Sequence, residues 1–296
     1  WPSSLDMFEA ATRTVECTDW FGLLALFDGY EQSPTVGSGE TVTARLHRIL
    51  DLAEIPDADR DIGTSAITCA ATSLGGNILS QLRQAAATDG GHIWVAPDGR
   101  ITFRSRSDIW TSSAANTVVW SAVNDGSLVG GNVALYAGTP QVQEHDAYSA
   151  FFLARDGGST QTEIDTELKD RIGWVTYERT DIISDSDEQV AGLGAYLMAS
   201  QPRTGQYQVT GVVLRPDIHA EAQLIALTHN PFDRMSVGYE YPVAGLTAIE
   251  REGLITGVEH VITTTTWQTR LTLEDVTGFG AFEIGSSAIG GDDFIP

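Results

Sequence analysis

Positive charge is scarce in this sequence. Its 296 residues include 17 lysines and arginines against 40 aspartates and glutamates, which gives a formal net charge of -23, and Lys169 is the only lysine. A chain this acidic repels the phosphate backbone of nucleic acids, so nucleic-acid binding would require a local basic patch. We therefore expect no specific nucleic-acid binding.

Cysteine and long apolar runs are also scarce. Cys17 and Cys69 are the only cysteines and form no CxxC motif, which argues against a disulfide scaffold and a cysteine metal site. We expect both to be buried free thiols. No apolar run has the length of a membrane-spanning helix, so no integral membrane segment is expected. The chain begins at Trp1 without a basic, apolar leader, and we expect it to be part of a longer gene product.

Motifs for catalysis, phosphate binding and metal binding are missing as well. The sequence contains no GxSxG elbow, no GxxxxGK[ST] loop and no GxGxxG after a strand. The histidines show no HExxH or HxH spacing that would place two imidazoles on one metal. They are His47, His92, His145, His219, His229 and His260. We predict no catalytic, cofactor-binding or metal-binding residues, no cofactor, and a protein that is not an enzyme.

Two groups of residues have a functional and a structural interpretation. Asp181, Asp185 and Asp187 could suggest calcium, but they lack the glycine and closing glutamate of an EF-hand loop, and helix capping by Ser184 or Asp185 explains them better. Four aromatic residues could form a sugar-binding platform or could pack one sheet on another. They are Trp110, Trp120, Tyr136 and Tyr148. Forty carboxylates leave a glycosidase pair possible, but no pair is singled out.

The stretch SGETVTARLHRILDLAEIP, residues 38–56, decides between a basic helix and a packing helix. Its apolar residues fall on one helical stripe, which predicts a helix ended by Pro56. They are Val42, Leu46, Ile49, Leu50 and Ala53. Arg45 lies at the edge of that stripe, and Arg48 is within ion-pair reach of Asp51. Because arginines and carboxylates alternate, packing is favoured over nucleic-acid binding.

The remaining patterns predict a mixture of helices and strands. We expect a strand at 12–18, a short helix capped by Asp19, a strand at 65–72, a helix within 75–91 and a hairpin at 92–106 with a Pro-Asp-Gly turn. Further strands are expected near 116–123, 147–155, 171–179, 205–216 and 233–240, a helix at 184–200, a short helix near 217–227 and two paired strands at 253–276. This order predicts an α+β fold.

Three stretches, taken in order, resemble the hub or minor tail proteins at the tail tip of long-tailed bacteriophages. VECTDWFGLLALFD with VGSGETVTARLHRILDLAEIP is similar to that family's strand, Asp-Trp helix, Gly-x-Gly-Glu turn and Arg-x-x-x-Ile-Leu helix. LGGNILSQLRQAAATDGGHIWVAPDGRITFRSR is similar to its helix and hairpin, and GVEHVITTTTWQTRLTLEDV with FEIGSSAIGGDDF to its closing strands. Residues 107–150 match least, and of the family's first barrel only the last strand, near Val15, is recognisable.

The resemblance implies β-barrel-like domains with a small helix-plus-hairpin α+β insert. The expected division is 1–28, the end of a first barrel-like domain plus a linking helix; 29–110, the α+β insert; 111–205, a mixed β-rich connecting region ending in a helix; and 206–296, a second barrel-like domain and C-terminal tail. The implied function is that of a structural baseplate hub or minor tail protein of the virion, located at the tail tip.

The implied assembly is a homotrimeric ring that joins the tail tube to other tail proteins. Expected partners are distal tail protein or tail tube subunits, the tape measure protein, and tail fibre or receptor-binding proteins. Residues 111–296 carry 25 of the 40 acidic side chains, and a negative lumen would keep passing DNA from sticking. The residues also leave open a secreted β-rich protein that binds or cleaves carbohydrate.

Overall fold

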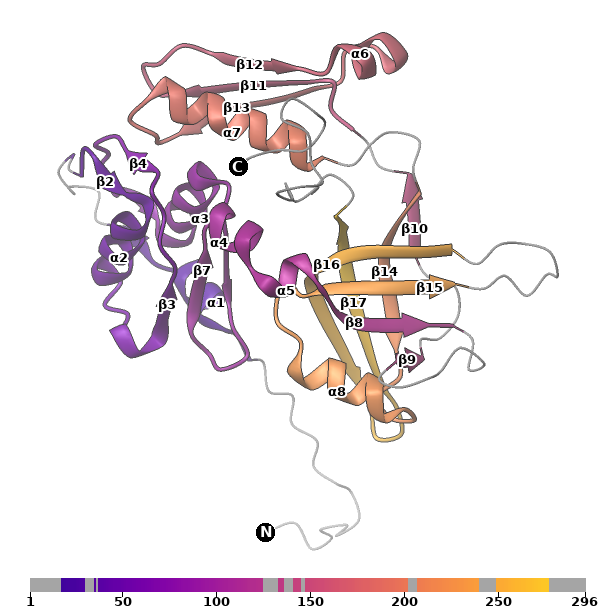
Figure 1. Ribbon diagram of the computed structural model, residues 1–296. Coiled ribbons are helices and arrows are strands. Elements are labelled where there is room, and N and C mark those ends of the chain that lie inside the picture. The colour runs from indigo at the N-terminus through magenta and orange to yellow at the C-terminus, as the bar shows by residue number, and fades with distance from the viewer. Residues whose placement is uncertain are drawn as a thin grey trace, which may run out of the picture.

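The computed structural model describes residues 17–29, 35, 37–124, 133–135, 141–144, 147–201, 207–239 and 249–276. The protein is an α+β protein, as the sequence predicts: the described residues form eight α-helices and five sheets. Figure 1 shows three units, which we call the N-terminal unit (residues 17–111), the middle unit (147–201) and the seven-stranded unit (118–144 and 207–276, as far as described). No helix in the described ranges is long and apolar enough to cross a membrane.

The N-terminal unit contains short strands packed around two longer helices. Its elements are α1 (Trp20–Leu24), β1 (Asp28–Gly29), β2 (Glu40–Thr41), α2 (Val42–Leu52), β3 (Arg60–Ile62), β4 (Thr68–Cys69), β5 (Gly76–Asn77), α3 (Ile78–Asp89), β6 (His92–Val95), β7 (Ile101–Arg104) and α4 (Arg106–Thr111). The predicted hairpin is confirmed, with Ile93 paired to Phe103 and Val95 to Ile101. The predicted cap of the first helix is also confirmed, because Asp19 accepts a hydrogen bond from the Gly22 backbone N–H.

Helix α2 buries the predicted apolar stripe but ends by a different device. Thr41 caps its first turn by accepting from the Ala44 N–H, and four stripe residues are fully buried. Pro56 does not end the helix. Glu54 instead adopts the left-handed region at φ 54°, and the Glu54 and Ile55 N–H groups donate back to the carbonyls of Asp51 and Leu50. This is a Schellman motif with glutamate where glycine is usual.

Arg45 is fully buried rather than placed at the edge of the stripe. Its Nε donates to Glu40, its Nη1 to Thr72 Oγ1 at 2.6 Å, and its Nη2 to the carbonyls of Ala70 at 2.7 Å and Gly37 at 3.2 Å. A buried guanidinium requires such complete pairing, because unpaired charge in the interior costs several kcal/mol. Arg45 therefore fixes the 37–40 turn and the 70–72 segment against α2.

Glu40 receives both arginines of the helix. Arg48 donates to its carboxylate through Nη2 at 2.6 Å and Nε at 3.2 Å, so the expected Arg48–Asp51 pair is wrong, and Asp51 pairs with Arg60 instead. Partial burial raises the pKa of Glu40, but hydrogen bonds from the two arginines outweigh burial and hold this pKa below its usual range. Gly37, at φ 84°, permits this approach, because a Cβ there would clash with the carboxylate.

The middle unit is a three-stranded sheet covered by a helix. It consists of β11 (Ala150–Arg155), β12 (Gln161–Ile164), α6 (Thr166–Ile172), β13 (Thr176–Ile182) and α7 (Asp187–Ser200). Helix α7 has the expected acidic first turn, but its cap is Ser186, which accepts from the Gln189 N–H, and not Ser184 or Asp185. Its apolar face packs Val190 and Leu193 on Leu153 and Ile182.

The middle unit is joined to the N-terminal unit by backbone pairing. The Ala70 N–H donates to the Ile183 carbonyl at 2.7 Å, and Cys69 forms an isolated antiparallel bridge with Ser184. The Gln189 side chain donates to Thr68 Oγ1 at 2.8 Å and accepts from the Thr68 N–H. The segment after β13 therefore adds a further pairing partner to β4.

The seven-stranded unit is a mixed sheet with helix α8 (Ala220–Thr228) packed on it. Its strand order is β10-β14-β17-β16-β15-β8-β9. The strands are β8 (Val118–Val123), β9 (Val133–Leu135), β10 (Gln141–Glu144), β14 (Tyr207–Leu214), β15 (Arg234–Tyr239), β16 (Ile249–Ile262) and β17 (Trp267–Asp275). A short helix, α5 (Ser113–Asn116), connects α4 to β8. Among the described strands β10 and β9 form the two edges, so this sheet is open rather than a closed barrel.

Strand β16 is long enough to pair with two different strands along its length. It pairs with β15 from Ile249 to Leu254 and with β17 from Gly253 to Ile262. A register shift between Ile255 and Gly257 marks a bulge at the changeover, where a strand bends and twists more strongly. Figure 1 shows the result: β15 and β8 run across the direction of β14 and β10.

Three expectations have other outcomes. Cys17 is exposed, so the burial predicted for it is wrong. Cys69, in contrast, is fully buried as expected, and burial raises the pKa of its thiol to about 11. The predicted strand at 12–18 lies almost entirely outside the described residues. The four-part domain division stays a prediction.

The Glu40 network predicts a large loss of stability in Glu40→Gln. The neutral amide would leave the buried Arg45 without its counter-charge, and we expect the free energy of unfolding in urea to fall by about 3 kcal/mol. Asp57→Asn is the matched control, because the Asp57 side chain is 92% exposed and 3.4 Å from Arg60; its change should stay below about 0.5 kcal/mol.

The same network predicts a pH dependence. A carboxyl whose pKa is lowered on folding stabilises the native state above its unfolded pKa, near 4.5 for glutamate, and that stability is lost as the pH falls through the folded value. Glu40→Gln should therefore lose less stability than the parent on acidification from neutral pH. Equal losses would contradict the assignment.

Glu54→Gly is predicted to stabilise the protein by about 1 kcal/mol, because glycine adopts the left-handed conformation without the strain that a Cβ imposes. Glu54→Ala keeps the Cβ and should show no such gain. Thermal unfolding of the parent and the two variants checks this. A Glu54→Gly protein no more stable than the Glu54→Ala protein would refute the Schellman assignment.

Candidate functional site

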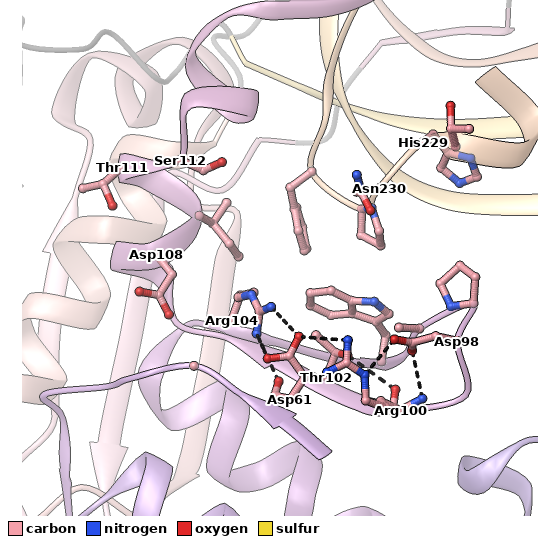
Figure 2. Close-up of a pocket in the computed structure, with 18 of the residues that line it drawn as sticks. Asp61, Asp98, Arg100, Thr102, Arg104, Asp108, Thr111, Ser112, His229 and Asn230 are labelled. Atoms are coloured by element: carbon pink, nitrogen blue, oxygen red, sulfur yellow. Dashed lines mark hydrogen bonds and ion pairs between the residues drawn. The ribbon is translucent and has the colours of Figure 1, made fainter. Parts of the chain in front are cut away.

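A cleft of about 870 Å³ lies between the N-terminal unit and the seven-stranded unit. Figure 2 shows its two walls: the β6–β7 hairpin with α4 on one side, and the segment after α8 with His229 and Asn230 on the other. Clefts at unit boundaries are common places for ligand sites. We therefore take it as the candidate functional site.

The floor of the cleft is a set of closed ion pairs. Arg104 binds Asp61 through both Nη atoms, at 2.7 and 3.2 Å, and Arg100 Nε lies 2.7 Å from Asp98. The Arg104 hydrogen bond lowers the pKa of Asp61, and hydrogen bonds from the Arg100 backbone and side chain lower the pKa of Asp98. Both carboxyls are thus held ionised by arginines of the β6–β7 hairpin.

The opposite wall reaches across to the hairpin through Phe232. Its ring centroid lies 4.7 Å from that of His92 and 5.6 Å from that of Trp94, the latter edge to face. Phe232 adopts φ 69°, an uncommon conformation for a residue with a large side chain. Such conformations persist where surrounding contacts fix them, and here the contacts join one unit to the other. Phe232 also lines a smaller pocket of about 280 Å³, together with β6 and the β16 bulge.

Asp233 holds this segment in place. Its side chain is 3% exposed, and Oδ2 accepts from Trp120 Nε1 at 2.8 Å and from the Asn230 N–H at 2.9 Å. The Phe232 N–H donates to the Ile255 carbonyl at 2.7 Å, and the Ile255 N–H donates to the Asp233 carbonyl at 3.0 Å. The Phe232 contact is therefore anchored to β8 and to the bulge of β16.

The chemistry of the cleft does not favour acid–base catalysis. A glycosidase needs a carboxylic acid with a raised pKa beside a carboxylate, whereas the shifted carboxyls here, Asp61 and Asp98, are shifted downward. Asp108 accepts from the Ser105 N–H in the capping box of α4. In the part of the chain that the structure describes, no three His, Cys, Asp or Glu side chains are grouped to hold a metal ion. The expected absence of catalytic, cofactor and metal residues stays a prediction.

The aromatic residues considered for sugar binding are packed in separate clusters. Trp110 meets Tyr196 of α7 at 6.0 Å, Trp120 donates to Asp233, and Tyr148 packs on Phe151 and Tyr177. Tyr136 lies outside the described residues. The three described residues thus make structural contacts, and the structure does not assemble them into one platform.

The acidic cluster and the histidines are likewise dispersed. Asp181 pairs with Arg179, Asp185 accepts from Thr68, and Asp187 pairs with Arg155. Of the histidines, His92 packs on Phe232, His229 contacts the Ile225 carbonyl, His260 contacts Thr269, His219 lies beside Glu221 and His47 is in α2. His145 lies outside the described residues.

Large apolar side chains are exposed in several groups on the surface. Those on or beside α8 include Leu227, which also lines the cleft, and a second group lies at the outer end of β16. The two groups are Ile218, Leu224 and Leu227, and Val258, Val261 and Ile262, each 44% to 72% exposed. In β16 the side chains of Val258 and Ile262 share one face and that of Val261 lies on the other. Exposed apolar side chains that share a face are typical of protein–protein contacts.

Sequence reasoning missed Phe232 and Trp94 as cleft residues. They are 138 positions apart (232 − 94), so no local pattern links them. One signal was present: Asn230-Pro231 before Phe232-Asp233 is turn chemistry between a helix and a strand, where functional loops concentrate.

The described fold resembles two solved tail proteins. The tail protein from Neisseria meningitidis MC58 superposes with a TM-score of 0.54 and 13% sequence identity, over 82% of this chain and 69% of that one. The 43 kDa tail protein of prophage MuSo2 from Shewanella oneidensis superposes with a TM-score of 0.52 and 12% identity, over 86% and 69%. No protein-family model and no curated protein matches the sequence. At such low identity the likeness is one of fold.

Asp233→Ala is predicted to lower the free energy of unfolding by about 1–3 kcal/mol, because it removes the shared acceptor of the Trp120 and Asn230 N–H groups. Asp233→Asn keeps one carbonyl acceptor and should lose about half as much. Urea unfolding followed by tryptophan fluorescence measures both. Asp170→Ala is the control, because the Asp170 side chain is 72% exposed and lies 4.0 Å from Lys169. Equal stability of the Asp233→Ala variant and the parent would refute the anchor.

Proposed function

We propose that this chain is a structural protein of a bacteriophage tail, and that it acts as a hub at the tail tip. In this proposal three copies form a ring that joins the tail tube to the tape measure protein and to receptor-binding or fibre proteins. The role is non-enzymatic and its location is the virion. The observation that carries the proposal is the shared fold with two tail proteins across more than four-fifths of the chain.

The surface supports an assembly role. Exposed apolar side chains lie on or beside α8 and at the outer end of β16. A ring requires two different surfaces per copy, one for each neighbour, since its contacts are heterologous. Burial of side chains such as Leu227 and Ile262 would supply the hydrophobic contribution that contact needs.

The charge of the chain fits a tube through which DNA passes. Clustering of acidic side chains toward the ring axis would repel the phosphate backbone and leave the lumen non-adhesive. An outward-facing distribution in the assembled ring would overturn this part of the proposal.

The alternative, a secreted β-rich protein that binds or cleaves carbohydrate, has weaker support. Its described aromatic residues lie in separate packing contacts, and Asp61 and Asp98 of the cleft have lowered pKa values. Titration with soluble oligosaccharides distinguishes the two functions: saturable binding by a stable monomer would favour the alternative.

The ring proposal predicts a salt-dependent trimer. Like-charged copies repel one another, and salt screens that repulsion while leaving apolar contacts intact. Light scattering after size-exclusion chromatography should therefore show the trimer fraction rising between about 20 mM and about 500 mM NaCl.

Leu227→Asp and Ile262→Asp should each reduce the trimer, whereas Arg179→Gln, which changes a surface ion pair on β13, should not. A monomer at every salt concentration would overturn the ring. Electron microscopy of the virion tail provides the direct test, since three copies around the tail axis are expected.

A further inference from the structure

A second pocket lies away from the cleft, between α4 and α7, and we call it the α4–α7 pocket. Its volume is about 400 Å³. Helix α7 contributes small residues on successive turns, Gly192, Ala195 and Ala199, and Ile67 and Trp110 form apolar walls. Because Val190 and Leu193 on another face of α7 pack on the middle sheet, the helix is held in place while this face stays open.

Arg106 supplies the cation of the α4–α7 pocket. Its guanidinium lies 5.5 Å from the centroid of the Tyr196 ring, and Tyr196 in turn meets Trp110 edge to face at 6.0 Å. Arg106 Nη1 is buried and has no hydrogen-bond partner among the described residues. A buried charged donor without an acceptor is costly, and a ligand carboxylate would relieve that cost.

The carboxyl that lines the pocket, Asp89, already accepts hydrogen bonds from other donors. Asp89 is 2% exposed, accepts from Ser65 Oγ, and accepts from the backbone N–H of Arg106 at 2.8 Å. Burial raises the pKa of Asp89 and raises that of Tyr196 to about 12, so the phenol is neutral. Asp89 and Glu274 both act electrostatically on Tyr196. Because these carboxyl groups repel further negative charge, the pocket can bind one ligand carboxylate at Arg106 but disfavours a polyanion.

We propose that the α4–α7 pocket binds a peptide segment of a partner protein, which inserts apolar side chains between α4 and α7 and places one carboxylate against Arg106. The volume of about 400 Å³ accommodates apolar side chains, and the charge complementarity is limited to one acidic group. A partner segment with an acidic residue beside aromatic or aliphatic ones has this chemistry. This surface differs from the ring contacts of the proposed function, so either inference can fail alone.

The test uses the 296-residue chain and two peptides, acetyl-Ala-Asp-Phe-Ile-Ala-amide and its twin with Asn in place of Asp. In isothermal titration calorimetry the Asp peptide should bind about tenfold more tightly, the value of one charge-assisted hydrogen bond. Arg106→Gln should bring the ratio of the two affinities close to one, and Arg106→Lys should keep part of the preference. Ala195→Trp should abolish binding of both peptides by filling the pocket.

Arg179→Gln is the matched control, since it removes a guanidinium from β13, and it should leave the ratio unchanged. Circular dichroism verifies that each variant is folded, and Arg106→Lys keeps the test valid if Arg106→Gln unfolds. Absence of peptide binding to the parent chain, or equal affinities for its two peptides, would overturn the proposal. Displacement of the Asp peptide by equimolar inorganic phosphate would also overturn it, because the pocket would then be a general anion site.

Discussion

The need to neutralise one buried guanidinium organises the N-terminal unit. Arg45 enters the core from α2, and its donors reach Glu40, Gly37, Ala70 and Thr72 on segments that lie far apart in the sequence or outside the helix. Removing any acceptor would leave charge uncompensated in a medium of low polarity, so the geometry of all of these segments is coupled. Ala70 also pairs with the middle unit through its backbone N–H. The ion pair thus positions the seam between units as well as the helix.

The seam between the N-terminal and seven-stranded units follows the same logic with different groups. A buried carboxylate, Asp233, fixes a short segment, and that segment presents the ring of Phe232 to Trp94 and His92. At both seams a buried, hydrogen-bonded polar group fixes the position of a segment, and apolar contacts hold the two units together. The large cleft lies along the second seam and the α4–α7 pocket lies where α4 faces α7. Cavities accordingly lie where the units meet.

Local patterns predicted most of the elements, whereas tertiary partners escaped prediction. The β6–β7 hairpin and α3 follow from turn chemistry and apolar spacing within a few residues. The burial of Arg45 could not be foreseen from the helical wheel, because its acceptors at 37–40 and 70–72 lie outside the helix. The end of α2 at Glu54 departs from the glycine preference on which sequence rules depend. The cleft could not be predicted, since Phe232 and Trp94 meet only in the folded chain.

The backbone pairing of Ala70 with Ile183 can form only after residue 183 has been synthesised. Residue 183 follows residue 70 by 113 positions (183 − 70), and ribosomes add about 5–20 residues per second. On the order of ten seconds therefore pass between the emergence of β4 and the arrival of its last partner. Throughout that interval the edge of β4 is unpaired on the nascent chain, open to strands from neighbouring polypeptides. Until residue 183 has emerged, pairing of β4 within its own chain competes with pairing between copies that are translated side by side.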